Sequence, residues 1–136
     1  MKDFICSEDY KPLLPNGIYE AQCVNYDSKF ILGKTRKVFL NFKILDSGVH
    51  NGKLIFQAFN MPYNGKIKMG SKYYKTWVMV NGWQKPSRNT KMLPRLFRNK
   101  IFKIRTWTAK PKHHGKDMPD DFLYSVVDEI LEVVAG

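Results

Sequence analysis

Between Asp46 and Asp117 lie 70 residues that include 16 lysines or arginines and no aspartate or glutamate. The same stretch contains ten aromatic residues. Cations neutralise phosphates and release counterions, and each exposed ring offers a stacking surface worth roughly 1–3 kcal/mol per base. These residue types are therefore suited to holding a flexible polyanion whose bases can stack. The alternative is that the rings form the core and the lysines an ordinary solvated face, although such faces normally mix both signs of charge.

The charges are unevenly distributed along the chain, whose net charge is +11. Residues 117–136 hold six acidic residues and no basic one, whereas residues 1–46 are close to balance. A net charge of this size predicts an acidic partner: nucleic acid first, an anionic membrane second and an acidic protein third. The acidic C-terminal segment either shields the basic region or recruits a protein, or it is an amphipathic element with an ordinary polar face.

Few residues are arranged for catalysis. Metal-dependent nucleases need clustered carboxylates, and the only dense group is Asp117, Asp120 and Asp121, which follow His113 and His114. We interpret this group as a polar loop, because adjacent histidines on a regular strand do not easily ligate one metal ion. The sequence contains no Gly-rich phosphate loop, no GxSxG or HExxH motif and no paired CxxC. We therefore expect no enzymatic activity, no catalytic residue, no metal site and no cofactor.

The length and composition are those of one folded domain. The chain has 136 residues, of which 43% are hydrophobic, and this is sufficient for a core of its own. We divide it into an N-terminal extension (residues 1–13) and a single domain (residues 14–136). No apolar run is long enough for a transmembrane helix, and the first residues lack the pattern of a signal peptide. Cys6 and Cys23 are interpreted as free thiols, so we expect a cytoplasmic protein without a membrane partner.

Alternating apolar residues predict four strands. The clearest is residues 37–44, where every second residue from Val38 onward is apolar. The other three are residues 18–26, 54–60 and 101–108. In the strand at 54–60 we expect three residues to point inward and two outward. The inward ones are Leu54, Phe56 and Ala58, and the outward ones are Gln57 and Phe59.

One internal helix is predicted at residues 72–81. Ser71 can cap its N-terminus and Gly82 can end it, while Tyr73 and Trp77 share one apolar face that we assign to the core. A long basic connection, residues 83–100, follows the helix. Connections of this length are usually functional or mobile.

The C-terminal segment, residues 122–134, fits two descriptions. Tyr124 to Val127 suits a fifth strand, whereas Ser125 and Asp128 resemble a helical capping box. We expect a short strand that runs into a short terminal helix.

The order of three strands, a helix and one or two further strands resembles that of OB-fold single-stranded DNA-binding proteins, particularly the small, divergent ones of phages and mobile elements. The resemblance covers about residues 14–134. It rests on the element order, on the sequence Pro15–Ala21 before and into the first strand, and on outward rings between lysines. It implies a mainly β protein, a five-stranded OB-fold-like barrel with one helix between strands three and four. The acidic, phenylalanine-ended tail of bacterial housekeeping members is not matched by Val133–Gly136, so its recruiting role is not carried over.

Strand geometry specifies the expected binding surface. If the apolar face of residues 37–44 fills the interior, Phe39 points outward between two lysines, where a base can stack on it. Trp107 repeats this pattern on the strand at 101–108. The predicted nucleic-acid-binding residues are Lys37, Phe39, Lys43, Phe59, Lys72, Lys75, Trp83, Arg88, Arg95, Lys103, Arg105, Trp107, Lys110 and Lys112.

From the residues and the resemblance together, we expect a non-enzymatic protein that binds single-stranded DNA with little sequence preference in replication or recombination. RNA is an alternative ligand, because a basic OB surface does not by itself read the 2′-hydroxyl. A protein-interaction module is an alternative of another class. In that case the outward rings form a homodimer interface or bind a replication or recombination partner.

Overall fold

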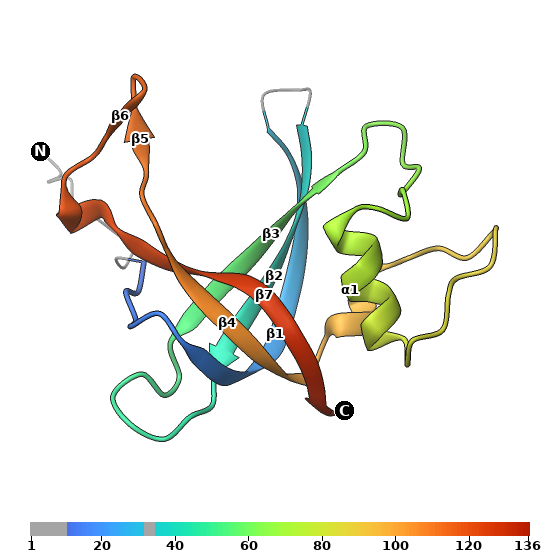
Figure 1. The fold of residues 1–136 in the computed structure, drawn as a ribbon, viewed down its shortest axis with the longest axis horizontal. Coiled ribbons are helices and arrows are strands. Elements are labelled where there is room, and N and C mark those ends of the chain that lie inside the picture. The colour runs from blue at the N-terminus through green and yellow to red at the C-terminus, as the bar shows by residue number, and fades with distance from the viewer. Residues whose placement is uncertain (1–10, 32–34) are drawn as a thin grey trace, which may run out of the picture.

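The computed structural model describes residues 11–31 and 35–136 (Figure 1). The helices and strands of these residues follow one another in the order below. They are β1 (Ile18–Ile31), β2 (Thr35–Ile44), β3 (Leu54–Met61), α1 (Lys72–Val80), a first 3-10 helix (Pro94–Phe97), β4 (Ile101–Ala109), β5 (Lys112–His113), β6 (Lys116–Asp117), a second 3-10 helix (Asp120–Phe122) and β7 (Tyr124–Ala135). Most of the predicted N-terminal extension, residues 1–10 with Cys6, lies outside the described residues.

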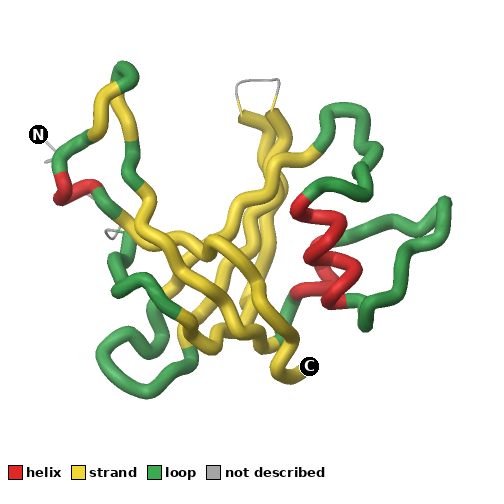
Figure 2. Tube along the Cα trace, in the orientation of Figure 1, coloured by secondary structure: helices red, strands yellow, loops and turns green. Residues whose placement is uncertain are grey.

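Five strands form one antiparallel sheet in the order β3-β2-β1-β4-β7, and β5 and β6 form a separate hairpin. Figure 2 shows the sheet as a curved layer, with α1 and its flanking loops on one side. The mainly β class, the five-stranded sheet and the helix between its third and fourth strands are confirmed. The predicted closed barrel is not formed, because β3 and β7 are the edges of the sheet and do not pair in the described part of the chain.

The two edges of the sheet approach each other through side chains. Gln57 on β3 is buried, and its Nε2 donates a hydrogen bond to the backbone carbonyl of Asp128 on β7 (3.2 Å). The ammonium group of Lys72, at the start of α1, donates to the same carbonyl. Within the described residues, side chains and no backbone ladder therefore join the two edges of the sheet at this position.

β3 faces the opposite way from the prediction. Ile55, Gln57 and Phe59 are buried, whereas Leu54 is exposed. In the pairing with β2, Phe59 lies opposite Val38, which is a core residue. Directly opposed residues share a face of the sheet. The predicted orientation is wrong because both faces of this strand carry large apolar residues, and only the partner strand decides between them.

β7 is a continuous strand, so the predicted terminal helix is wrong. The helix-like spacing of Val127 and Ile130 arises from a β-bulge, since three residues of β7 span two residues of β4 at this point. Both side chains are buried as a result. The Ser125 hydroxyl does not cap a helix; it accepts a hydrogen bond from the backbone N–H of Leu14 (2.7 Å).

α1 forms close to its predicted bounds, and the cap at Ser71 is confirmed. Tyr73 and Trp77 are buried against the sheet, as expected. Both also bond to the segment that follows the helix. The Tyr73 hydroxyl donates to the carbonyl of Met92 (2.7 Å), and the Trp77 indole donates to the carbonyl of Leu93 (3.1 Å). The middle of the basic connection is thus tied to the helix.

Candidate nucleic-acid interface

Three aromatic side chains from different strands meet on the outer face of the sheet. Phe39 on β2 contacts Phe56 on β3 edge to face with ring centroids 5.7 Å apart, and Phe56 stacks on Tyr124 of β7 at 6.1 Å. Phe56 lies opposite Asn41, two residues from Phe39 along the same face of β2, so the strand register brings the two rings together. All three rings are half-buried. We call Phe39, Phe56 and Tyr124 the ring cluster.

Lysine ammonium groups lie over these rings. The ammonium of Lys29, on β1, is 5.8 Å from the ring centroid of Phe39. The ammonium of Lys11, before β1, is 5.5 Å from the centroid of Phe56 and 4.4 Å from that of Tyr124. A cation over an aromatic face is attracted by the ring quadrupole. The ring cluster therefore combines flat apolar surface with positive charge, the two features that a stacked, negatively charged strand requires.

Trp107 extends the aromatic surface onto β4. Its side chain is 58% exposed. It lies opposite Val126 of β7, on the outward face that also carries Tyr124. The outward orientation predicted for Phe39 and Trp107 is confirmed, although the neighbouring rings partly cover Phe39.

Phe59 does not belong to this surface. Its side chain is only 2% exposed, and its ring meets the edge of Tyr73 at a centroid distance of 5.4 Å. Because β3 turns this residue inward, it cannot reach a ligand on the outer face of the sheet. The prediction that Phe59 stacks on a base is wrong.

The cations of β4 are paired with acidic residues of β7. Arg105 contacts the carboxylates of Asp128 (2.7 Å) and Glu129 (2.8 Å), and Lys103 contacts Glu132 (3.2 Å). The hydrogen bond to Asp128 is the main cause of the raised pKa of Arg105. Exposed ion pairs of this kind contribute little to stability because water and salt screen them. The acidic C-terminal segment thus competes with any phosphate for these two cations. This arrangement agrees with the first of the alternatives stated for this segment, in which it shields part of the basic region.

Four further predicted cations lie around the ring cluster and the nearby hairpin. Lys37 and Lys43 are on the outward face of β2, in alternation with its core residues. Lys110 and Lys112 are exposed between β4 and the start of the β5–β6 hairpin. This hairpin projects beyond the sheet on the side where β7 begins (Figure 1).

The remaining predicted residues lie elsewhere. Lys72 bonds to the carbonyl of Asp128, between the two sheet edges. Exposed residues on or after α1 form a separate group, at the opposite end of the molecule from the β5–β6 hairpin (Figure 1). They are Lys75, Trp83 (73% exposed), Arg88 and Arg95. The predicted set is therefore divided between two surfaces.

Four residues of this surface are absent from the predicted nucleic-acid-binding residues: Phe56, Tyr124, Lys11 and Lys29. Phe56 was assigned inward, and Tyr124 begins the segment whose strand character was ambiguous. The alternation from Tyr124 to Val127 was the available signal, because a strand at this position directs Tyr124 and Val126 to one face. The contact of Tyr124 with Phe56 depends on the approach of β7 to β3 and has no local signal.

Chemistry other than binding has few candidate groups. Among residues 11–31 and 35–136, no group of three or more histidine, cysteine, aspartate or glutamate side chains could hold a metal ion. The rings of His113 and His114 lie 4.1 Å apart at the β5–β6 turn. In the same residues, no helix is both long and apolar enough to cross a membrane.

No protein-family model matches this chain, and no curated protein has a significant sequence match to it. Function is therefore inferred from the chemistry of the surfaces themselves.

Proposed function

We propose that this protein binds single-stranded DNA with little sequence preference, in replication or recombination in the cytoplasm. The observation that carries this proposal is the ring cluster, in which three strands contribute outward-facing rings beneath two lysines. Every base has a π face, so stacking on such rings tolerates any sequence. The surface would act by binding, without a chemical step.

Phosphate contacts would come from lysines that surround the ring cluster. Lys37 and Lys43 flank Phe39 on β2, and Lys110 and Lys112 lie near the hairpin. None of these four lysines forms an ion pair with an acidic residue in the described part of the chain. With a net charge of +11, counterion release should give the complex a strong salt dependence.

The architecture we propose for this surface is that of an OB-fold. The strand order β3-β2-β1-β4-β7 and the helix between β3 and β4 support it, because closing β3 onto β7 would give a five-stranded barrel. OB-folds bind oligonucleotides on strands two and three and on the loops after strands one and four. Here β2 and β3 carry Phe39 and Phe56, and the β5–β6 hairpin follows β4, the fourth strand of the sheet (Figure 1).

Tryptophan fluorescence during titration with oligo-dT, oligo-U and duplex DNA at several salt concentrations tests the proposal. A Trp83→Phe variant leaves Trp107 as the exposed indole, since Trp77 is buried, so quenching then reports on the outer face of the sheet. We expect strong quenching by oligo-dT that weakens with salt. Duplex DNA should bind much more weakly because its bases already stack on one another.

Three other results would redirect the proposal. Stronger quenching by oligo-U than by oligo-dT would indicate RNA as the ligand. Equal binding of all three nucleic acids without quenching would indicate that the surface binds any polyanion through its charge and that the rings do not stack on bases. A Phe39→Ala variant with altered oligomeric state and unchanged nucleic-acid affinity would assign the rings to a protein interface.

A further inference from the structure

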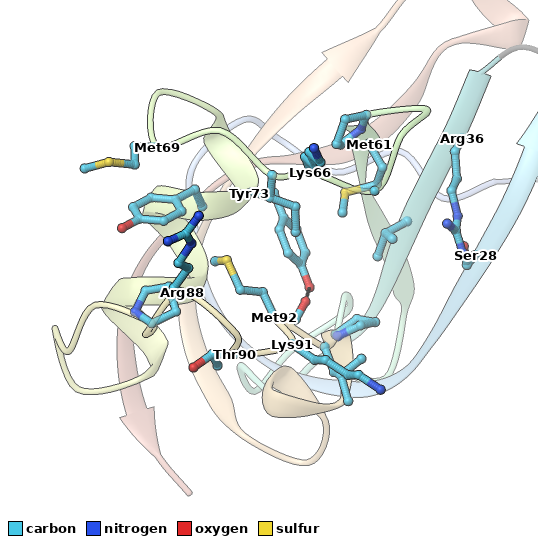
Figure 3. A pocket seen from close by; sticks show the side chains of 18 of the residues that line it. Ser28, Arg36, Met61, Lys66, Met69, Tyr73, Arg88, Thr90, Lys91 and Met92 are labelled. Atoms are coloured by element: carbon cyan, nitrogen blue, oxygen red, sulfur yellow. Dashed lines mark hydrogen bonds between the residues drawn. The ribbon is translucent and has the colours of Figure 1, made fainter.

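A pocket of about 900 Å³ lies on the face of β2 opposite to the ring cluster. Figure 3 shows side chains that line it. Arg36 and Val38 line it, and they alternate along β2 with Lys37 and Phe39, which face outward. Its other walls are Ser28 of β1, the end of β3 with the segment that follows it, the first turn of α1 and the segment after α1. The volume is at the upper end of the range of about 300–1,000 Å³ found for ligand pockets. It is therefore a second candidate site, separated from the first by the thickness of the sheet.

Every charged side chain that lines this pocket is a cation. They are Arg36, Lys66, Arg88 and Lys91. Lys66, Arg88 and Lys91 are exposed and form no ion pair within the described residues. The cations come from separate segments, and Arg36 and Arg88 lie toward opposite sides of the pocket in Figure 3. Charges spread in this way fit a ligand with several separated carboxylates better than a single phosphate group.

The apolar lining contains methionines and offers little ring surface. Met61, Met69 and Met92 come from three different segments, and methionine side chains adapt to ligands of irregular shape. Tyr73 is buried with its hydroxyl bonded to the chain, so its ring presents no face to a base. Of the two aromatic residues that line the pocket, Tyr73 and Tyr74, only Tyr74 has a partly exposed side chain. Single-stranded DNA binds on successive stacking platforms, so this lining favours a peptide over a nucleic acid.

Hydrogen bonds hold the outer wall of the pocket in place. Tyr73 and Trp77 of α1 donate to the carbonyls of Met92 and Leu93. Earlier in the same segment, Ser87 and Thr90 close a turn through two backbone N–H bonds, each about 3.0 Å long. A wall that is fixed before binding reduces the ordering cost of association. The pocket is thus pre-organised although it is built from loops.

We propose that this pocket binds a short peptide segment of a partner protein in which acidic residues flank an apolar side chain. The apolar side chain inserts among the methionines, and the flanking carboxylates pair with Lys66, Arg88 and Lys91. The proposal goes beyond nucleic-acid binding and does not depend on it, because the two sites lie on opposite faces of β2. The protein could hold a strand on one face and a partner on the other.

Selection of random short peptides displayed on phage, with the full chain as the target, tests the proposal. We expect the selected peptides to be enriched in aspartate and glutamate beside leucine, methionine or phenylalanine. A labelled selected peptide then measures affinity by fluorescence anisotropy. Arg88→Glu combined with Lys91→Glu should weaken it by about tenfold or more, because two attractive charges become repulsive. The matched control, Lys43→Glu with Lys110→Glu, makes the same charge change beside the ring cluster and should leave it nearly unchanged.

The proposal is overturned if no peptide is enriched, if the enriched peptides lack acidic residues, or if both double variants lose affinity equally. Competition between the labelled peptide and oligo-dT tests whether the pocket binds nucleic acid in place of a peptide. If oligo-dT displaces the peptide and the Arg88 and Lys91 reversal abolishes oligo-dT binding, the pocket belongs to the nucleic-acid path. All four substituted residues are exposed, and circular dichroism verifies that each variant keeps the fold.

Discussion

The ring of Phe56 on β3 stacks on the ring of Tyr124 on β7, with centroids 6.1 Å apart and planes inclined by 27°. These strands are the two edges of the sheet. The contact therefore joins the edges on the outer face, next to the point where Gln57 bonds to the carbonyl of Asp128. A ligand that stacks on these rings would touch both edges at once and favour their approach.

Truncating Tyr124 tests whether the ring cluster is a stacking platform. We expect Tyr124→Ala to weaken oligo-dT binding by about 1–3 kcal/mol, the value of one stacked base, as measured by fluorescence titration. Phe122→Ala is the matched control, because Phe122 is 52% exposed two residues away and lies outside the cluster. Unchanged affinity in Tyr124→Ala, or an equal loss in both variants, would contradict this role.

The acids of β7 should restrain nucleic-acid binding. Glu129→Gln with Glu132→Gln removes the ion pair of Lys103 and one of the two ion pairs of Arg105, which keeps Asp128 as its partner. Oligo-dT affinity should therefore rise and its salt dependence should become steeper. The free energy of unfolding should change little, since exposed ion pairs contribute little to stability. Titrations at several salt concentrations measure both affinity effects.

The control for this pair of substitutions is Asp120→Asn with Asp121→Asn. It makes the same change in net charge, and neither aspartate forms an ion pair in the described part of the chain. If both double variants gain affinity equally, the effect is one of net charge, and the loss of the ion pairs with Glu129 and Glu132 is not its cause.

The orientation of β3 has a consequence for stability. Phe59→Ala should lower the unfolding free energy by about 3–5 kcal/mol, because it opens a cavity in the core beside Tyr73. Trp107→Ala removes a ring of comparable size from the surface and should cost much less. Urea unfolding measures both. If Phe59→Ala lowers the free energy of unfolding only slightly, the side chain of Phe59 is not buried in the core and the inward orientation of β3 is contradicted.

Local sequence patterns predicted the elements that depend on neighbouring residues. The alternation from Val38 onward corresponds to β2, because a strand with one buried face needs apolar residues at every second position. The capping residue Ser71 and the turn at Gly82 likewise marked the ends of α1. These signals require no knowledge of any distant part of the chain.

The features that sequence could not supply depend on strand pairing. The two faces of β3 are similar in apolar character, so only the register with β2, in which Phe59 lies opposite Val38, decides which face is buried. The bulge of β7 against β4 places Val127 and Ile130 on one face with a spacing that imitates a helix. The ring cluster and the ion pair of Lys103 with Glu132 join segments far apart in sequence.

The buried thiol of Cys23 should make stability fall in alkaline solution. Cys23 is free and buried on β1, and burial raises its pKa from 9.0 to about 12, with Arg98 opposing the shift. Between pH 9 and 12 the unfolded chain therefore loses this proton while the folded chain keeps it. The free energy of unfolding then falls by up to about 1.4 kcal/mol for each pH unit in this window and is unaffected by this group below it.

Urea unfolding of the wild type and of Cys23→Ala at about pH 8 and about pH 10 measures the effect. The stability advantage of the wild type should shrink at the higher pH, because the variant lacks the titrating group. The raised pKa of Tyr73 is common to both proteins and cancels, so an advantage that stays constant would mean that the thiol is not held in a buried, neutral state.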